Sequence, residues 1–200
     1  MTKYYLSLLY KPPAVFLICI LSLSSCSPIG LAIGAGASLV TATQTEKGLK
    51  NSADDLRIKA EINHHLFQRD HRLFGAVKIS VENGRVLITG SVKKPKERIE
   101  ITKLSWKVSR VREVINEAQV TSGSNIADQA KDLLINKALQ AQLLIDQDVK
   151  FINYSVDTVN GTVYVFGVAR DQAELNKVIS HARNTNYVEN VISYVTIKDE

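Results

Sequence analysis

The sequence predicts an α+β fold made of two tandem copies of one αββαβ unit, each a three-stranded mixed sheet covered by two helices. The two halves of the 200-residue chain align without a gap at a constant offset of 77 residues. Each half places an Asn-Gly pair between runs of alternating apolar residues, which predicts a β-hairpin because both residues tolerate positive φ. Apolar residues at helical spacing precede and follow each hairpin.

The elements are predicted in the same order in copy 1 (residues 54–121) and copy 2 (residues 126–200). Pro95 suits the first turn of a helix, and Asp171 suits a helix N-terminus because a carboxylate there complements the helix dipole. In copy 1 we predict a first helix over 54–68, a hairpin over 77–90, a second helix over 96–110 and a last strand over 114–120. In copy 2 the same elements are predicted over 126–145, 154–167, 171–184 and 188–197.

The N-terminal segment has the composition of an export signal. Lys3 and Lys11 precede an apolar run of ten residues over 14–23. The first acidic residue is Glu46. A membrane-spanning helix needs about 20 apolar residues, so the run is short for an N-terminal membrane anchor, which is the alternative. We expect a signal peptide over residues 1–25.

The residues that end this segment, Leu23-Ser24-Ser25-Cys26, resemble a bacterial lipobox. The resemblance implies that the Cys26 thiol receives a diacylglyceryl group and that its amino group, once free, receives an acyl chain. An ordinary signal peptide with an incidental cysteine is the alternative. Ser27, where an aspartate would resemble an inner-membrane retention signal, favours the outer membrane. Residues 26–53 are rich in small residues and are expected to form a flexible tether.

The repeated unit as a whole resembles the BON domain. A [VI]-x-[VI]-x-G strand follows each Asn-Gly turn, ending at Gly90 and Gly167, and a V-x-x-V-I pattern follows in each copy. Nearly the whole chain resembles the dual-BON bacterial outer-membrane lipoproteins, with BON domains expected at 54–121 and 126–200. The resemblance implies phospholipid binding, a role in envelope integrity under stress, and no catalytic residues.

The residues themselves also predict no enzyme. The four histidines, at 64, 65, 71 and 181, have no spacing typical of a metal site, and no G-x-S-x-G or P-loop pattern occurs. Cys19 belongs to the predicted signal, which leaves residues 54–200 without a thiol. We therefore expect no catalytic site, no metal, no small-molecule substrate, and no cofactor besides the acyl chains on Cys26.

The basic charge of the chain belongs to copy 1. The whole chain has a formal net charge of +5 and a pI near 9.1, which indicates a polyanionic partner. Copy 1 holds 14 basic and nine acidic residues, whereas residues 122–200 hold seven and ten. Because an exported chain rarely meets nucleic acid, we expect an anionic phospholipid membrane as the partner and no nucleic acid.

Two surfaces are candidates for lipid contact. On the second helix of copy 1, Trp106 is predicted opposite the core beside Lys103, Lys107 and Arg110, as in an interfacial anchor. The alternative is that Ile99 and Trp106 pack against copy 2 or the tether.

The first helix of copy 2 is the second candidate, because it carries an additional apolar stripe. Its members are Leu134, Ala138, Ala141 and Ile145, where copy 1 has Arg57, Glu61, His64 and Gln68. Either lipid covers this stripe or copy 1 buries it at an interdomain seam.

These observations favour a lipid-anchored binding module on the periplasmic face of the outer membrane, which contacts anionic phospholipid and helps to maintain the membrane. The alternative is a protein-interaction adaptor that docks an envelope assembly or division factor, with lipid serving only as a tether.

Overall fold

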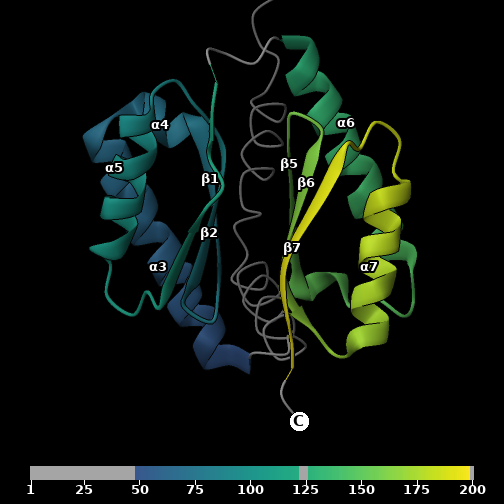
Figure 1. The fold of residues 1–200 in the computed structure, drawn as a ribbon. Helices are drawn as coiled ribbons and strands as arrows, with labels where there is room; N and C mark the ends of the chain where they lie inside the picture. Colours follow the sequence, from purple (N-terminus) through teal and green to yellow (C-terminus); the bar gives the residue numbers. More distant parts are fainter. Residues whose placement is uncertain (1–47, 122–125, 199–200) are drawn as a thin grey trace, which may run out of the picture. The chain divides into compact units, whose positions relative to one another are not determined.

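The computed structural model describes residues 48–121 and 126–198, and it confirms the α+β fold with two αββαβ copies (Figure 1). The predicted signal peptide, Cys26 and most of the predicted tether lie outside the described residues. Copy 1 comprises α3 (Gly48–Arg69), α4 (His71–Ala76), β1 (Val77–Glu82), β2 (Arg85–Val92), α5 (Pro95–Trp106), β3 (Glu113–Asn116) and β4 (Gln119–Val120). Copy 2 comprises α6 (Ile126–Ile145), the 3-10 helix η1 (Phe151–Asn153), β5 (Tyr154–Val159), β6 (Thr162–Ala169), α7 (Gln172–Asn184) and β7 (Asn190–Ile197).

Each copy contains a mixed sheet with its helices on one face (Figure 1). β1 and β2 are antiparallel, and β3 and β4 both pair with β2 in parallel. In copy 2, β5 and β6 are antiparallel, and β7 pairs in parallel along β6. Helices α5 and α7 make the crossover connections that parallel neighbours require. The parallel register is the same in both copies, with Val86 opposite Val114 and Val163 opposite Val191.

The largest differences from the predicted boundaries lie in copy 1. Helix α3 begins at Gly48, inside the predicted tether, and the short helix α4 was not predicted. Helix α5 ends at Trp106 instead of residue 110, because the N–H groups of Lys107 and Val108 bond to the carbonyls three residues earlier, a tightening typical of a helix end. The last strand of copy 1 is divided into β3 and β4, whereas β7 is continuous.

The side chain of Asn116 accounts for the division of that last strand. Its amide donates to the carbonyl of Arg98 at 2.9 Å and to Thr102 Oγ1 at 2.7 Å. Its Oδ1 accepts the N–H of Ala118 at 3.0 Å. The copy 2 position 77 residues later is Ser193, whose shorter side chain leaves β7 regular.

A carboxylate in the first half of each first helix, buried in copy 1 and half-buried in copy 2, holds the hairpin turn. Asp55 accepts the N–H groups of Asn83 and Gly84 at 2.8 and 2.9 Å. In copy 2, Asp132 accepts those of Asn160 and Gly161 at 2.7 and 2.8 Å. The four turn residues have φ between 48° and 75°, as the Asn-Gly pairs predicted. The two aspartates were not among the predicted site residues, although they are 77 residues apart.

A glutamate in the first turn of the second helix also accepts backbone N–H groups in both copies. Glu97 Oε2 accepts the N–H groups of Lys93 and Lys94, at 2.9 and 3.1 Å. Glu174 accepts the N–H groups of Lys150 and Arg170 at 2.6 and 2.7 Å and is only 1% exposed. These bonds attach the second helix to the strand before it and, in copy 2, to the loop after α6.

Each copy has its own apolar core between its sheet and its helices, and a third cluster joins the two sheets. The core of copy 1 includes Ile62, Leu66 and Ile101, and that of copy 2 includes Ile135 and Leu139, among others. The third cluster consists of Leu87, Val159, Tyr164 and Phe166, with Ile115, Ile192 and Tyr194 packed against it. We call these seven residues the sheet seam.

Polar contacts complete the sheet seam. Lys78 Nζ lies 3.1 Å from Asp157 Oδ1, and Thr89 donates to the same carboxylate. The Tyr194 hydroxyl donates to Glu117 Oε1 at 2.6 Å. Burial and this carboxylate raise the pKa of Tyr194 to about 12. The two copies are therefore connected through the faces of their sheets that do not carry helices.

Candidate functional site

Among the residues that the structure describes, the largest run of exposed apolar side chains lies on α6, on the side opposite its buried residues Ile135, Leu139 and Leu143. Leu134 is 64% exposed and Ile145 is 79% exposed, and Ala138 and Ala141 are also exposed. We define the α6 outer face as the exposed residues on this side: Ile126, Ala127, Ala130, Leu133, Leu134, Lys137, Ala138, Ala141, Leu144 and Ile145.

The structure therefore brings all four predicted stripe residues to the surface, and the prediction that copy 1 buries them is wrong. The copies instead pack through the sheet seam, because β2 and β6 carry apolar residues on both of their faces. All eight residues of β6 are buried. The sequence contained a signal for this arrangement, since Val163–Val168 is an almost continuous apolar run, which is typical of a strand covered on both faces.

The equivalent helix of copy 1 presents a charged surface at the matching positions. Arg57 Nε lies 2.8 Å from Glu61 Oε1, one helical turn away, and both side chains are more than a third exposed. His64 and Gln68 are exposed along the same helix. The two copies thus share a fold and differ in what their first helices present to the surroundings.

The second candidate surface, on α5, is only partly as predicted. Trp106 and Ile99 are 52% and 55% exposed, so neither is buried against copy 2. Lys103 and Lys107 are exposed beside Trp106. Arg110 is not on this face: it lies beyond the end of α5 with φ 71° and forms an ion pair with Asp54. We define the α5 outer face as Lys96, Ile99, Lys103, Trp106 and Lys107.

An acidic residue borders the α5 outer face. Arg69, whose Nε donates to Glu100 Oε1 at 2.9 Å, lowers the pKa of that carboxyl, and Lys103 and Lys107 lower it further. Because Glu100 is paired with Arg69, the lysines of the face keep their positive charge available for an anionic surface.

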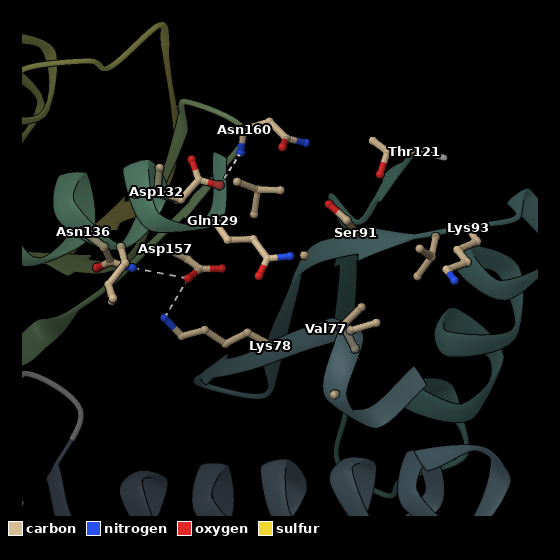
Figure 2. Close-up of a pocket in the computed structure, with 17 residues that line it drawn as sticks. Val77, Lys78, Ser91, Lys93, Thr121, Gln129, Asp132, Asn136, Asp157 and Asn160 are labelled. Atoms are coloured by element: carbon tan, nitrogen blue, oxygen red, sulfur yellow. Dashed lines mark hydrogen bonds and ion pairs between the residues drawn. The ribbon is translucent and has the colours of Figure 1, made fainter. Parts of the chain in front are cut away.

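A cavity of about 730 Å³ is lined by residues of both copies, next to the sheet seam (Figure 2). Lys78 and Asn136 both donate to Asp157 Oδ1, and Asp132 accepts the N–H of Asn160 in the hairpin turn (Figure 2). Both carboxylates at the cavity are thus engaged by protein donors. This cavity was not predicted, because it depends on how β1, β2, β5 and α6 meet.

Neither a metal cluster nor a membrane-spanning helix is found in the part of the chain that the structure describes. Within residues 48–121 and 126–198, no three His, Cys, Asp or Glu side chains converge as metal ligands would. None of the described helices combines the length and the apolar character that a bilayer span requires.

These features define a class of protein: a duplicated αββαβ domain whose copies share a scaffold and differ in their exposed helix faces. The chain belongs to the BON domain family, whose model matches residues 54–122 and 131–199.

Three curated proteins are similar to this chain. An Anaplasma centrale protein described as "Uncharacterized protein in gshII 5'region" is 38% identical over 146 residues, covering 72% of this chain and 95% of the relative. The outer membrane lipoprotein DolP of Haemophilus influenzae is 27% identical over 184 residues, covering 91% and 93%. A 21 kDa hemolysin of Actinobacillus pleuropneumoniae is 27% identical over 146 residues, covering 71% and 75%.

Proposed function

We propose that this chain is a non-catalytic, lipid-anchored protein of the outer membrane that contacts phospholipid through the α6 outer face and helps to keep the envelope intact. The observation that carries the proposal is the exposure of this face. Monomeric soluble proteins rarely expose a contiguous apolar surface of this kind without a binding role. The equivalent helix of copy 1 shows that the fold itself does not require it.

The apolar area is sufficient for a shallow membrane contact. Five large aliphatic residues of the face are between 58% and 86% exposed: Ile126, Leu133, Leu134, Leu144 and Ile145. Transfer of such side chains from water to a hydrocarbon boundary contributes about 1–2 kcal/mol each. The sum is several kcal/mol before the cost of immobilising the protein, which suits reversible contact by a domain that a separate anchor keeps nearby.

The α5 outer face supplies a weaker, electrostatic contribution. Trp106 can lie at headgroup depth while Lys103 and Lys107 approach lipid phosphates. Copy 1 as a whole carries five more basic than acidic residues. An anionic leaflet would therefore attract copy 1, and copy 2 would contribute the hydrocarbon contact.

The anchor and the location rest on the N-terminal sequence and on one relative. The lipobox-like residues 23–26 support acylation of Cys26, and the Haemophilus influenzae relative is by its name an outer membrane lipoprotein. We place the two BON copies on the periplasmic face. Metabolic labelling with palmitate should label the wild-type chain and leave Cys26→Ala unlabelled, whereas labelling of both would contradict acylation at this residue.

Flotation of the unacylated chain (residues 27–200) with vesicles of phosphatidylethanolamine and phosphatidylglycerol tests the lipid contact. Leu134→Glu should lower the bound fraction at least about tenfold, because it removes an apolar group and adds a charge that must be desolvated. Its thermal melt should not change, since the side chain is exposed.

Leu56→Glu is the matched control, because Leu56 is a similarly exposed leucine on the first helix of copy 1. It should bind vesicles as the wild type does. Equal losses in the two variants would contradict a specific contact by α6. Absence of binding by the wild type would overturn lipid contact and leave the adaptor function, in which lipid serves only as the tether.

A further inference from the structure

We infer that copy 2 binds an extended, acidic segment of a partner protein as an added strand on the free edge of β7. The segment occupies the groove between this edge and α7, and it places a carboxylate side chain beside Arg183. This surface is separate from the α6 outer face, so the site does not depend on the proposed lipid contact.

The backbone of β7 has one unpaired side. It forms an edge of the copy 2 sheet and pairs with β6 alone. The N–H of Lys198 donates to the carbonyl of Ala169 at 2.8 Å, so the even-numbered residues of β7 face β6. Because backbone groups alternate in direction along a strand, the N–H and C=O groups of the odd-numbered residues point away from the sheet. These outward residues are Val191, Ser193, Val195 and Ile197.

Copy 1 closes the equivalent edge with its own side chains. The Arg98 guanidinium donates to the outward carbonyl of Asn116, and Asn116 Oδ1 accepts the outward N–H of Ala118 at 3.0 Å. The Asn116 amide also donates to Thr102 Oγ1 of α5 at 2.7 Å. These contacts cover the middle of the edge and divide the strand into β3 and β4, which are devices that prevent pairing with another chain.

Copy 2 leaves the same edge open. The three side chains that close the edge of copy 1 are replaced, 77 residues later, by those of Ser193, Leu175 and Ile179. For the outward backbone groups of β7, the described residues provide one contact, between the N–H of Val195 and Ser193 Oγ at 3.4 Å. The strand also contains no proline and no charged residue, which commonly protect an exposed edge. Its eight residues therefore offer about 26 Å of edge for pairing.

A groove of about 450 Å³ lies beside this edge, lined by Ser193 and by one side of α7. Leu175 and Ile179, one helical turn apart, are half-buried and form its apolar part. Arg183 follows one turn later, is exposed, and is the one ionisable residue that lines the groove. Peptides that extend a sheet edge obtain affinity from backbone hydrogen bonds and specificity from pockets for alternate side chains. The edge of β7 and the groove supply both.

The charge of the groove favours an acidic segment. Within residues 48–121 and 126–198, Arg183 has no hydrogen bond or ion pair. Lys177 and His181, which also lie on α7, are instead bonded to aspartates of copy 2. A guanidinium binds a carboxylate through two parallel hydrogen bonds, so an aspartate or glutamate next to Arg183 gains more than a neutral side chain does. Because Arg183 is in the last turn of α7, this acidic residue lies near the start of β7.

A second copy of this chain fits the edge less well than an extended segment does. Helix α7 packs over β7, because Val178 and Ala182 share the core of copy 2 with Val191 and Val195. Neighbouring strands lie about 4.8 Å apart, so a β7–β7 pair would bring two α7 helices to about the same separation. Packed helices stay about 8–10 Å apart. A segment that carries no helix over it avoids this clash.

Fluorescence anisotropy of labelled peptides with the unacylated chain (residues 27–200) tests the site. The probe is an acetylated and amidated peptide of eight residues, in which valine or isoleucine alternates with serine and a glutamate takes the last position of the apolar series. A second probe has the reversed order, so that both strand directions are measured. Matched peptides carry glutamine or lysine in place of the glutamate.

We expect one of the two orders to bind, at least about threefold more tightly with glutamate than with glutamine. Arg183→Glu should weaken binding of the glutamate peptide at least about tenfold and reverse the preference in favour of the lysine peptide. Lys59→Glu is the matched control, because it makes the same change of charge at an exposed position of copy 1. It should bind the peptides as the wild type does.

Two further measurements test the backbone pairing. Methylation of the peptide nitrogens should abolish binding when it is placed on one alternate set of residues and preserve binding on the other set, because only one set faces β7. The combined variant Leu175→Arg, Ile179→Thr and Ser193→Asn recreates the closed edge of copy 1 and should not bind. If it lowers the melting temperature, Ser193→Pro serves instead, because it removes an outward N–H that the fold does not use.

Three results would overturn the site. They are absence of binding by both peptide orders, equal binding of the glutamate, glutamine and lysine forms, and equal loss with the two methylation patterns. Sedimentation of the protein alone tests the other occupant: a dimer that Ser193→Pro dissociates would show that a second copy covers the edge, and it would also overturn the peptide site. None of these results alters the outcome of vesicle flotation, which tests the α6 outer face separately.

Discussion

Replacing Gly167 by alanine should strongly destabilise copy 2, and the structure shows why. Gly167 has φ +151°, and a Cβ built on it would lie 2.0 Å from the carbonyl oxygen of Asn153 and 3.1 Å from Cα of Tyr154. Tyr154 is its partner across the β5–β6 ladder. Both obstacles are backbone atoms, so no side-chain rotation relieves the clash. Gly90 has the same role in copy 1, with Ala76 O at 2.3 Å.

The expected destabilisation has two parts. A non-glycine residue in this backbone region costs about 1–3 kcal/mol. Moving the start of β5 away from β6 breaks ladder hydrogen bonds, each with a net contribution of about 1 kcal/mol, and loosens the packing of Tyr154. We therefore expect Gly167→Ala to lower the free energy of unfolding by about 3–5 kcal/mol, a value in the upper tail for single substitutions.

Urea denaturation of the unacylated chain measures this change, with Gly75→Ala as the control. Gly75 lies in helix α4, and an added Cβ would meet nothing within 4 Å. The same substitution there should be neutral or stabilise the protein by up to about 1 kcal/mol, because alanine favours a helix. A Gly167→Ala loss below about 1 kcal/mol would refute the steric argument.

Three further predictions follow from the polar contacts and the sheet seam. Glu174→Ala should cost about 3 kcal/mol in urea denaturation, because it removes a buried carboxylate and leaves two partly buried N–H groups without their acceptor. Glu97→Ala should cost about 1 kcal/mol, because its bonds are exposed to water, and equal losses would contradict this. The hydrogen bond from the His181 side chain lowers the pKa of Asp146 in the folded protein, so the ionised carboxylate stabilises the fold at neutral pH. This stabilisation is lost as the pH falls below about 4. In urea denaturation at about pH 7 and about pH 3, His181→Ala should show a smaller fall in the free energy of unfolding between the two pH values than the wild type does. Phe166→Ala should lower the free energy of unfolding by about 3–5 kcal/mol and weaken amide-exchange protection in β2 as well as in β6. Unchanged protection in β2 would show that the sheet seam does not couple the two copies.

The fold was predictable because its strongest determinants are local. Asn83-Gly84 and Asn160-Gly161 identify the hairpins, and the apolar spacing in each half identifies the helices. The division of the last strand was not predicted, because it depends on contacts between residues that are distant in the sequence. Asn116, for example, interrupts the strand through bonds to Arg98 and Thr102 of α5.

The candidate site was partly predictable for the same reason. Helical periodicity places Leu134 and Ile145 on one side of α6, but it does not show what lies opposite that side. That depends on the sheet seam, where Leu87 and Phe166 pack on the sheet faces that carry no helices. Arg110 was assigned to the α5 outer face because a regular helix was extended past Trp106, where the backbone departs from helical geometry.

The repeated carboxylates and glycines have a consequence for the history of the chain. Asp55 and Asp132, Gly90 and Gly167, and Glu97 and Glu174 are in each case 77 residues apart and make equivalent contacts. Because these internal contacts specify the unit, a duplicated copy could accumulate substitutions on its outer helix without losing the ability to fold. The first helix of copy 1 has a charged exterior and that of copy 2 an aliphatic one, so one duplicated shape presents two different surfaces.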